Sequence, residues 1–188
     1  MTRIAPLAPS AARPSLKMAY AYCRRRFGKV PEPFAVAAHA PRVFWSLARL
    51  ESSVERRWTK VDPHLRELAV LRAALTVDCP WCVDFGEMMS SKDGLPVEKL
   101  EALPGWRDSD AFTDLERLVL EYAEAMSTTP LQVTDELVAA LRQQLSDEQV
   151  VELTAYIALE NSRARTNAAL GIEPQGYSAG ACKVPVKT

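Results

Sequence analysis

No apolar run in this sequence approaches the roughly 20 residues that a helix needs to cross a bilayer. The first 18 residues, MTRIAPLAPSAARPSLKM, place prolines where a secretory signal needs a continuous apolar segment. The net charge is only -1, so the whole chain carries no basic field of the kind that holds nucleic acid. These absences predict a cytoplasmic protein that binds neither a membrane nor nucleic acid.

Signals for β-strands are also scarce. No segment alternates apolar and polar residues convincingly, and the Asp-Gly pair at 93–94 lies between helical patterns. Helical periodicity instead predicts helices over 15–27, 41–58, 62–77, 79–92, 96–103, 113–126, 134–145 and 146–170, with a loop at 104–110. We predict an all-α fold with one helical domain over 17–174, a flexible N-terminal arm over 1–16 and a loosely held tail over 175–188.

Several helix starts are marked by capping residues. Asp62 precedes a proline and is a good N-cap for the helix that follows. Thr113 with Glu116, and Ser146 with Gln149, have the spacing of capping boxes, in which each side chain bonds the other residue's backbone N–H. These pairs predict well-defined starts for two of the later helices.

Two helices carry notable apolar patterns. The helix over 41–58 has Val43, Leu47, Leu50 and Val54 at three-and-four spacing, which is typical of a helix with one apolar face. The last helix is apolar nearly all round from 150 to 159, which predicts a central position in the fold.

Metal ligands are few. Apart from Cys79 and Cys82, the only cysteines and histidines are Cys23, Cys182, His39 and His64, and they are scattered with no second paired motif. A structural zinc site needs four ligands in paired motifs. The chain also has no P-loop and no G-x-G-x-x-G motif. We therefore predict no metal, haem or nucleotide cofactor.

The segment DCPWCVDFGEMM places Cys79 and Cys82 three positions apart. Pro80 is tolerated only in the first turn of a helix, so Asp78 or Cys79 should be the cap. The two thiols then lie one turn apart on one face, within reach of each other. Backbone N–H groups at a helix start stabilise a thiolate, the form that attacks a peroxide or a disulfide. The pair can therefore supply an attacking and a resolving sulfur.

Such a thiol needs a group that moves protons, and Glu67 is the candidate. It precedes Cys79 with eleven residues between them and lies early on the preceding helix. Antiparallel packing of the two helices could bring its carboxylate near the second helix, where it could shuttle a proton. The alternative is that Glu67 is an ordinary polar position of a helix.

The stretch RELAVLRAALTVDCPWCVDF, with its Glu-x11-Cys-x2-Cys spacing, resembles the signature of the carboxymuconolactone decarboxylase family, in particular its AhpD-like alkylhydroperoxidase branch. The likeness continues through VTDEL, LSDEQVVELT and a final helix with Asn shortly before LGI, and covers about residues 30–174. It implies an all-helical fold that assembles as trimers or hexamers. It also implies reduction of a hydroperoxide through two cysteines, which a lipoyl-type or thioredoxin-like dithiol then reduces.

The resemblance assigns Glu67 as the relay carboxylate, and Cys79 and Cys82 as the redox pair with the second cysteine attacking. The helix-dipole argument favours Cys79 instead, so the order stays open. One position departs from the pattern, because the branch has a histidine four residues after the second cysteine and this chain has Gly86. Either a water beside Gly86 or His64 could take over the proton transfer.

We therefore predict a thiol-dependent peroxidase or disulfide oxidoreductase. One alternative is a lyase acting on a small carboxylated lactone, which needs no cysteine pair but needs an anion-binding arginine such as Arg72, Arg163 or Arg165. Another alternative is a vestigial, non-catalytic helical subunit. Trp81, Phe85, Met88 and Met89 could line an apolar substrate pocket, although their helical spacing favours packing in the core or at a subunit interface.

Overall fold

Helices make up the regular secondary structure of residues 2–178, which are the part of the chain that the computed structural model describes. In chain order they are α1 (Pro14–Phe27), α2 (Glu32–Ala37), α3 (Pro41–Arg57), α4 (Pro63–Thr76), α5 (Pro80–Lys92), α6 (Val97–Ala102), the 3-10 helix η1 (Leu103–Asp108), α7 (Asp114–Ser127), α8 (Asp135–Gln144) and α9 (Asp147–Leu170). The prediction of an all-α, single-domain fold is confirmed. The sequence analysis missed α2, and it assigned most of η1 to a loop.

The predicted caps are in place. The Asp62 side chain accepts hydrogen bonds from the backbone N–H groups of residues 64 and 65 at the start of α4. Both halves of the capping boxes form, between Thr113 and Glu116 for α7 and between Ser146 and Gln149 for α9. Each box satisfies backbone donors that would otherwise lack partners in the first turn.

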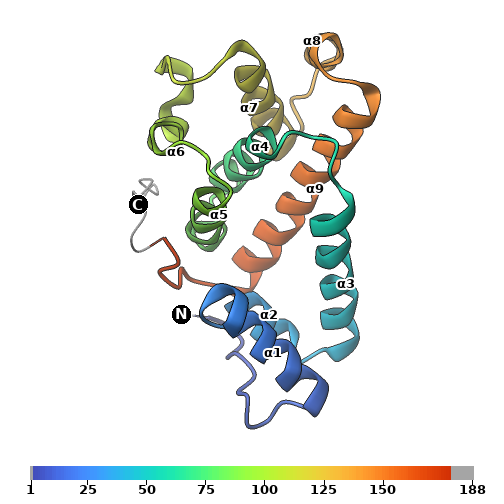
Figure 1. The fold of residues 1–188 in the computed structure, drawn as a ribbon, viewed down its shortest axis with the longest axis vertical. Helices are drawn as coiled ribbons and strands as arrows, with labels where there is room; N and C mark the ends of the chain where they lie inside the picture. The colour runs from blue at the N-terminus through green and yellow to red at the C-terminus, as the bar shows by residue number, and fades with distance from the viewer. Residues whose placement is uncertain (1, 179–188) are drawn as a thin grey trace.

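The long helix α9 runs through the middle of the molecule, and α4, α5, α7 and α8 all pack against it (Figure 1). Helix α4 contacts α5, α7 and α9 and is the hub of this arrangement. Leu68, Leu153 and Ile157 are fully buried in its core. Helices α1 and α2 form one end of the molecule, and α3 runs along its side. The central position predicted for the last helix is confirmed, although Val151 is 69% exposed.

The apolar stripe on α3 is exposed at three of its four residues. Val43 is 53% exposed and Leu47 and Leu50 are each 37% exposed, whereas Val54 is buried. The neighbouring Phe44 is buried instead, in a cluster with residues of α1 and α2. The physical reason is that α3 packs on these helices through the face that carries Phe44, which leaves the predicted stripe on the outer surface.

The first and last segments of the described residues contact the folded body. In the N-terminal arm, the backbone N–H of Arg3 donates to the carbonyl oxygen of Leu170, and that of Leu7 donates to Ala35, each at 2.9 Å. Helix α1 begins at Pro14, inside the segment expected to be flexible. The C-terminal segment is attached to α5 as far as residue 178. The rest of the tail, with Cys182, lies outside the described residues.

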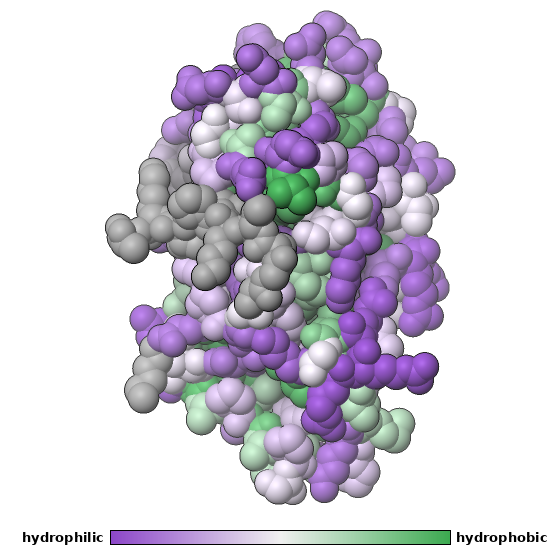
Figure 2. Space-filling view, turned by 60° about the vertical axis from the view of Figure 1, so that its left-hand side comes forward, coloured by the Kyte–Doolittle hydropathy of each residue, from purple (hydrophilic) through white to green (hydrophobic). Residues whose placement is uncertain are grey.

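The charges are unevenly distributed along the chain. Residues 1–60 hold 12 Lys and Arg against 3 Asp and Glu, and residues 61–188 hold 11 against 21. The net charge of -1 is thus the sum of a basic N-terminal part, which includes α1 to α3, and an acidic remainder. Hydrophilic side chains cover much of the face in Figure 2, with small apolar patches between them. No helix within residues 2–178 has the length and apolarity that crossing a membrane requires.

Candidate active site

Cys79 and Cys82 are joined in a disulfide at the start of α5, with their Cα atoms 5.3 Å apart. Cys79 is the N-cap of α5, and its Sγ accepts a hydrogen bond from the backbone N–H of Cys82 at 3.3 Å. Pro80 takes the first helical position, and Asp78 before the cap has a φ of 56° in the left-handed region. The short connection between α4 and α5 therefore places the sulfurs of the predicted redox pair one helical turn apart, in contact with each other.

Asn167 of α9 also contacts the disulfide. Its Nδ2 lies 3.4 Å from Cys82 Sγ and 3.8 Å from Cys79 Sγ, and the side chain is buried. An amide N–H that points at sulfur stabilises a thiolate after reduction. The sequence analysis used this asparagine only as part of the family pattern and gave it no role in the site. Its signal in the sequence is a polar residue two turns after Glu160 on the same face of a buried helix.

The cysteine pair is closed off from solvent by apolar side chains. Cys79 is 2% exposed and Cys82 is 6% exposed. Ala74, Ala164 and Ile172 belong to the same buried cluster. Beside them, Trp81 and Phe85 stack with their ring centroids 5.0 Å apart. These two aromatic residues therefore pack next to the pair in the closed structure, as their helical spacing indicated.

Glu67 reaches α5, as antiparallel packing allows, and its partner there is Ser90. Its carboxylate is buried and accepts hydrogen bonds from Arg66 Nε at 2.9 Å and from Ser90 Oγ at 3.0 Å. Ser90 lies eight residues after Cys82, which is roughly 12 Å along a helix axis. Antiparallel packing of α4 and α5 thus brings Glu67 to the second helix, two turns beyond the disulfide.

Leu71 fills the space beside Gly86. A Cβ at Gly86 would lie 2.7 Å from Leu71 Cδ2, so a larger residue at this position would force the Leu71 side chain to shift. The space beside Gly86 that a water could use is bordered by the Leu71 side chain. His64 lies in the first turn of α4, one turn farther along that helix from the cysteines than Glu67. His64 is therefore not positioned between Glu67 and the sulfurs.

A second buried carboxylate, Glu160, lies on α9. Burial raises its pKa to about 7, although the charge of Arg163 and a hydrogen bond from Arg163 Nη1 at 3.2 Å act in the opposite direction. Arg163 is shared, because its Nη2 also pairs with Glu51 at 2.5 Å. Glu160 lies two turns before Asn167. The sequence analysis missed it, although an acidic residue at the end of an otherwise apolar helical stretch was a usable signal.

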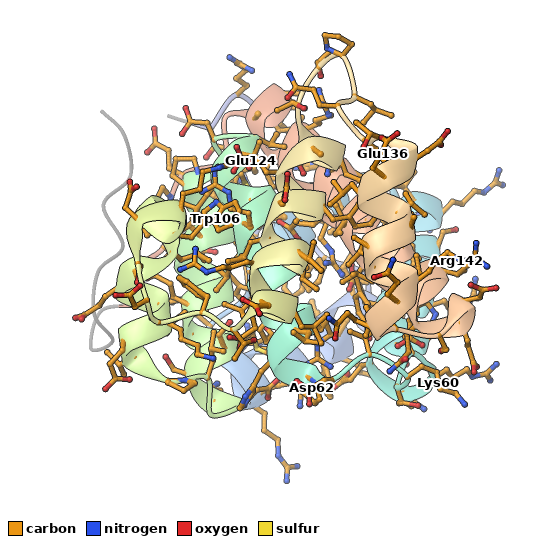
Figure 3. The ribbon with its side chains drawn as sticks, turned by 90° about the horizontal axis from the view of Figure 1, so that it is seen from above. Lys60, Asp62, Trp106, Glu124, Glu136 and Arg142 are labelled. Carbon is orange, nitrogen blue, oxygen red and sulfur yellow. A yellow bond between two sulfur atoms is a disulfide. The ribbon has the colours of Figure 1, made fainter. Side chains whose placement is uncertain are left out.

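The three arginines that could bind the substrate of a lyase form ion pairs or hydrogen bonds with other side chains. Arg72 pairs with Glu124 at 2.7 Å, and burial lowers the pKa of this arginine while the glutamate raises it. Figure 3 shows Glu124 close to Trp106, whose indole N–H donates to it at 3.2 Å. Arg163 pairs with two glutamates, and Arg165 is exposed and donates to a threonine hydroxyl. The three side chains do not form a common anion site.

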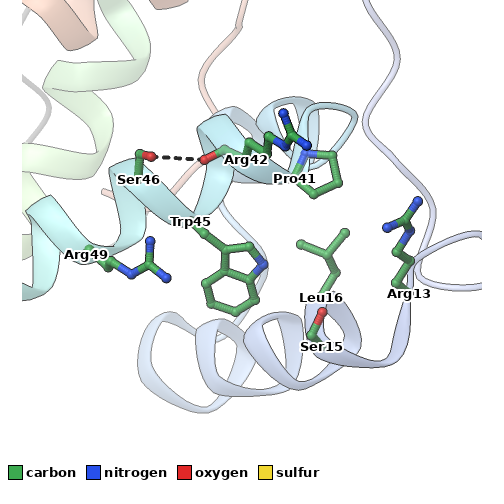
Figure 4. A pocket seen from close by; sticks show the side chains of 8 residues that line it. All are labelled: Arg13, Ser15, Leu16, Pro41, Arg42, Trp45, Ser46 and Arg49. Carbon is green, nitrogen blue, oxygen red and sulfur yellow. Dashed lines mark hydrogen bonds between the residues drawn. The ribbon is translucent and has the colours of Figure 1, made fainter.

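An open groove of about 420 Å³ lies between α1 and α3 (Figure 4). It is lined by Arg13, Ser15, Leu16, Pro41, Arg42, Trp45, Ser46 and Arg49. The groove contains no cysteine and no carboxylate, so it is separate from the disulfide site. Within residues 2–178, no group of three or more His, Cys, Asp and Glu side chains is arranged to hold a metal ion.

The chain is thus an all-helical protein with a Cys-x-x-Cys pair at the start of a helix. The model of the carboxymuconolactone decarboxylase family matches residues 41–125, from the start of α3 into α7. The uncharacterized protein YnjA of Escherichia coli is 37% identical over 164 residues, which are 87% of this chain and 88% of that protein. The chain belongs to the carboxymuconolactone decarboxylase family, in its AhpD-like branch.

Other relatives carry more specific names. The alkyl hydroperoxide reductase Rv2159c of Mycobacterium tuberculosis is 34% identical over 88 residues, which are 45% of this chain and 24% of that protein. The structure of ATU0492 from Agrobacterium tumefaciens, a protein of unknown function that its description relates to AhpD, has a TM-score of 0.68 at 27% identity and covers 73% of this chain and 94% of its own. The debrominase Bmp8, solved with 2,3,4-tribromopyrrole, has a TM-score of 0.84 at 20% identity over 96% of both chains, which shows a shared fold.

Proposed function

We propose that this protein is a thiol-dependent peroxidase in which Cys79 and Cys82 alternate between a dithiol and a disulfide. The observation that carries the proposal is the pairing of the two sulfurs at the N-terminus of α5, where a backbone N–H and the Asn167 amide point at them. The similarity to an alkyl hydroperoxide reductase supports the choice of a hydroperoxide as substrate.

The reaction balances with two thiols and one hydroperoxide. One thiolate attacks the terminal peroxide oxygen, and the O–O bond breaks. The alcohol departs, and the attacking cysteine is left as a sulfenic acid. The second thiol displaces water from the sulfenic acid and closes the disulfide. An external dithiol, of the lipoyl type or in a thioredoxin-like protein, then reduces the disulfide by thiol–disulfide exchange and becomes oxidised itself. We place this cycle in the cytoplasm, where thiols are kept reduced.

We assign the attack on the peroxide to Cys82. Its sulfur is nearer to the Asn167 amide, at 3.4 Å against 3.8 Å for Cys79, and Cys82 is the more exposed of the two. Cys79 would then be the resolving sulfur. The helix dipole favours the opposite order, so single replacements decide between them.

Glu67 supports the site in this proposal by fixing α5 through Ser90, as a positioning residue. Position 86 carries no side chain that could relay a proton, and the Leu71 side chain borders it, which supports a positioning role over a relay role for Glu67. The protons that the two thiols release would instead reach the alkoxide and the departing hydroxide through solvent, when the site opens, and complete the alcohol and the water.

We also propose a homo-oligomer. The exposed stripe of Val43, Leu47 and Leu50 on α3 is an apolar surface that fits a second copy of the chain. Analytical ultracentrifugation of wild type and of Leu47→Glu tests this assembly. A monomeric wild type would contradict it.

Reductive dehalogenation of a small aromatic ring is a second candidate. The observation that favours it is the stack of Trp81 and Phe85 beside the disulfide, together with the shared fold of a debrominase. In that reaction the dithiol supplies two electrons, halide leaves the ring, a proton replaces it on carbon, and the disulfide forms.

Steady-state assays separate these functions. Loss of cumene hydroperoxide is followed with dihydrolipoamide as reductant, and bromide release is followed with a bromopyrrole. Cys82→Ser and Cys79→Ser should each abolish turnover, while replacing the buried free thiol in Cys23→Ser should leave it unchanged. Cys79→Ser should still accumulate a sulfenic acid and Cys82→Ser should not. Equal hydroperoxide loss with wild type and the double serine variant would overturn the proposal.

A further inference from the structure

The carboxylate of one α5 residue, Asp84, holds both ends of the segment over residues 175–178. Asp84, two residues after Cys82, is buried. Its Oδ2 accepts the backbone N–H of Gln175 at 2.9 Å, and its Oδ1 accepts the backbone N–H of Ser178 at 2.8 Å and the Ser178 hydroxyl at 2.9 Å. A segment without regular secondary structure is thus held against the helix that begins at the disulfide.

Gln175 extends this attachment to Trp81, the residue that follows Pro80 between the cysteines. Its Oε1 accepts a hydrogen bond from the Trp81 indole N–H at 3.0 Å and another from the backbone N–H of Glu32 at 2.7 Å. Lys29 Nζ donates to the backbone carbonyl oxygen of Gln175. Ile172, just upstream, is part of the apolar cluster around the disulfide. Movement of this segment would therefore uncover the side chains that close the site.

The ring of Tyr177 lies within a set of aromatic and cationic contacts. It meets Phe85 edge to face at a centroid distance of 5.1 Å and Trp81 at 6.3 Å, with interplanar angles of 88° and 84°. Lys29 Nζ lies 4.4 Å from the centre of the Tyr177 ring. Edge-to-face packing and an ammonium over the ring face are the contacts that bind an electron-rich aromatic ring.

The hydroxyl group of Tyr177 does not fit this environment as well as its ring does. Its oxygen is buried and has no hydrogen-bond partner among the described residues. Burial raises the pKa of this phenol well above its ordinary value. A buried hydroxyl without a partner is unfavourable. The surroundings of Tyr177 therefore suit an aromatic ring without a polar group at the position of the tyrosine hydroxyl.

We propose that Trp81, Phe85 and Lys29 form a binding site for a small, planar, electron-rich aromatic molecule, and that Tyr177 occupies this site when the molecule is absent. Binding displaces residues 175–178 and opens the way to Cys82. The inference rests on the proposed function for the chemistry that follows binding, but the binding itself needs no turnover.

Calorimetric titration of the oxidised full-length protein with indole tests this proposal. Tyr177→Ala frees the site, so its apparent affinity for indole should exceed that of wild type by about tenfold or more, because the open state no longer competes with an internal ring. Tyr177→Phe keeps the ring and removes the unpaired hydroxyl, so it should bind indole no better than wild type. Tyr22→Ala removes an exposed tyrosine on α1 and should equal wild type.

Two further measurements control for misfolding of Tyr177→Ala and for binding that does not require an aromatic ring. Ser178→Ala loosens the tie to Asp84 without touching the site, so it should also tighten indole binding even if Tyr177→Ala fails to fold. Cyclohexanol, of similar size but without a π-system, should not bind. Equal indole affinity in Ser178→Ala, Tyr22→Ala and wild type would overturn the proposal, as would cyclohexanol binding as well as indole does. Failure of the peroxidase assay alone would leave these binding results unaffected.

Discussion

Replacing Glu160 by glutamine should stabilise the protein at neutral and alkaline pH. Glu160 is 4% exposed, and burial raises its pKa from 4.5 to about 7. Glutamine has nearly the same shape and its oxygen can still accept the hydrogen bond from Arg163. Arg163 also keeps its ion pair with Glu51. The substitution therefore removes an ionisable group and leaves the packing in place.

The size of the effect follows from the difference in pKa between the folded and unfolded states. Between pH 4.5 and about 7 the folded protein holds a proton on Glu160 that the unfolded chain has released. The free energy of unfolding of wild type therefore falls as pH rises through this window, and the loss is complete above pH 7. A shift of this size corresponds to roughly 3 kcal/mol in total. The glutamine variant lacks this decrease, so its advantage should grow from near zero at the acid end to roughly 3 kcal/mol, or about 10 °C in Tm.

Urea denaturation at several pH values between 4.5 and 8 measures this difference directly. Subtracting the wild-type curve from that of Glu160→Gln isolates the one carboxyl group from all others. Glu121→Gln, an exposed acid on α7, is the matched control and should follow wild type throughout. A difference between Glu160→Gln and wild type that stays the same at every pH would mean that Glu160 is ionised throughout, and the reasoning from burial would be refuted.

Three other substitutions test the surroundings of the disulfide. Gly86→His, which supplies the histidine that the AhpD-like branch has at this position, should lower the free energy of unfolding by roughly 1–3 kcal/mol because its Cβ collides with Leu71. Adding Leu71→Ala should recover part of this loss and raise the rate of hydroperoxide reduction. Asp84→Asn should cost about 2 kcal/mol in urea denaturation at pH 7 through weakened hydrogen bonds to residues 175 and 178. Burial raises the pKa of Asp84, but the hydrogen bonds outweigh it and leave the pKa below its ordinary value. The difference in stability between wild type and Asp84→Asn should therefore disappear as Asp84 becomes protonated below about pH 4. Glu67→Gln should slow disulfide formation far less than the roughly 100-fold expected for loss of a proton relay, with an unchanged pH profile.

Each of these outcomes can fail separately. A fully stable Gly86→His would mean that α4 and α5 separate easily. An Asp84→Asn variant as stable as wild type at neutral pH would remove the evidence for a firmly held C-terminal segment. A displaced pH profile in Glu67→Gln would restore the relay role that the sequence predicts for this carboxylate.

The features that sequence reasoning predicted are those set by neighbouring residues. The capping boxes of α7 and α9, and the one-turn spacing of Cys79 and Cys82, depend on contacts three residues apart. Such contacts form whenever the helix forms, so the sequence pattern is sufficient to predict them.

The features it missed depend on contacts between distant segments. Asn167 meets Cys82 across 85 positions of the chain, and the side chain of Leu71 fills the space beside Gly86 on another helix. The exposure of the stripe on α3 could not be predicted either, because periodicity identifies an apolar face but not its partner. The burial of Asp84 beneath residues 175–178 had no local signal at all. Short elements such as α2 carry too few residues for a periodic pattern.

Peptide mapping by mass spectrometry tests most directly whether the two cysteines are a reversible redox pair. The fully reduced protein is mixed with one equivalent of cumene hydroperoxide, quenched within seconds with a thiol-blocking reagent and digested. We expect a Cys79–Cys82 disulfide in most molecules, an unmodified Cys23, and recovery of both thiols after addition of dihydrolipoamide. Blocked free thiols at both positions after the peroxide pulse would contradict this expectation.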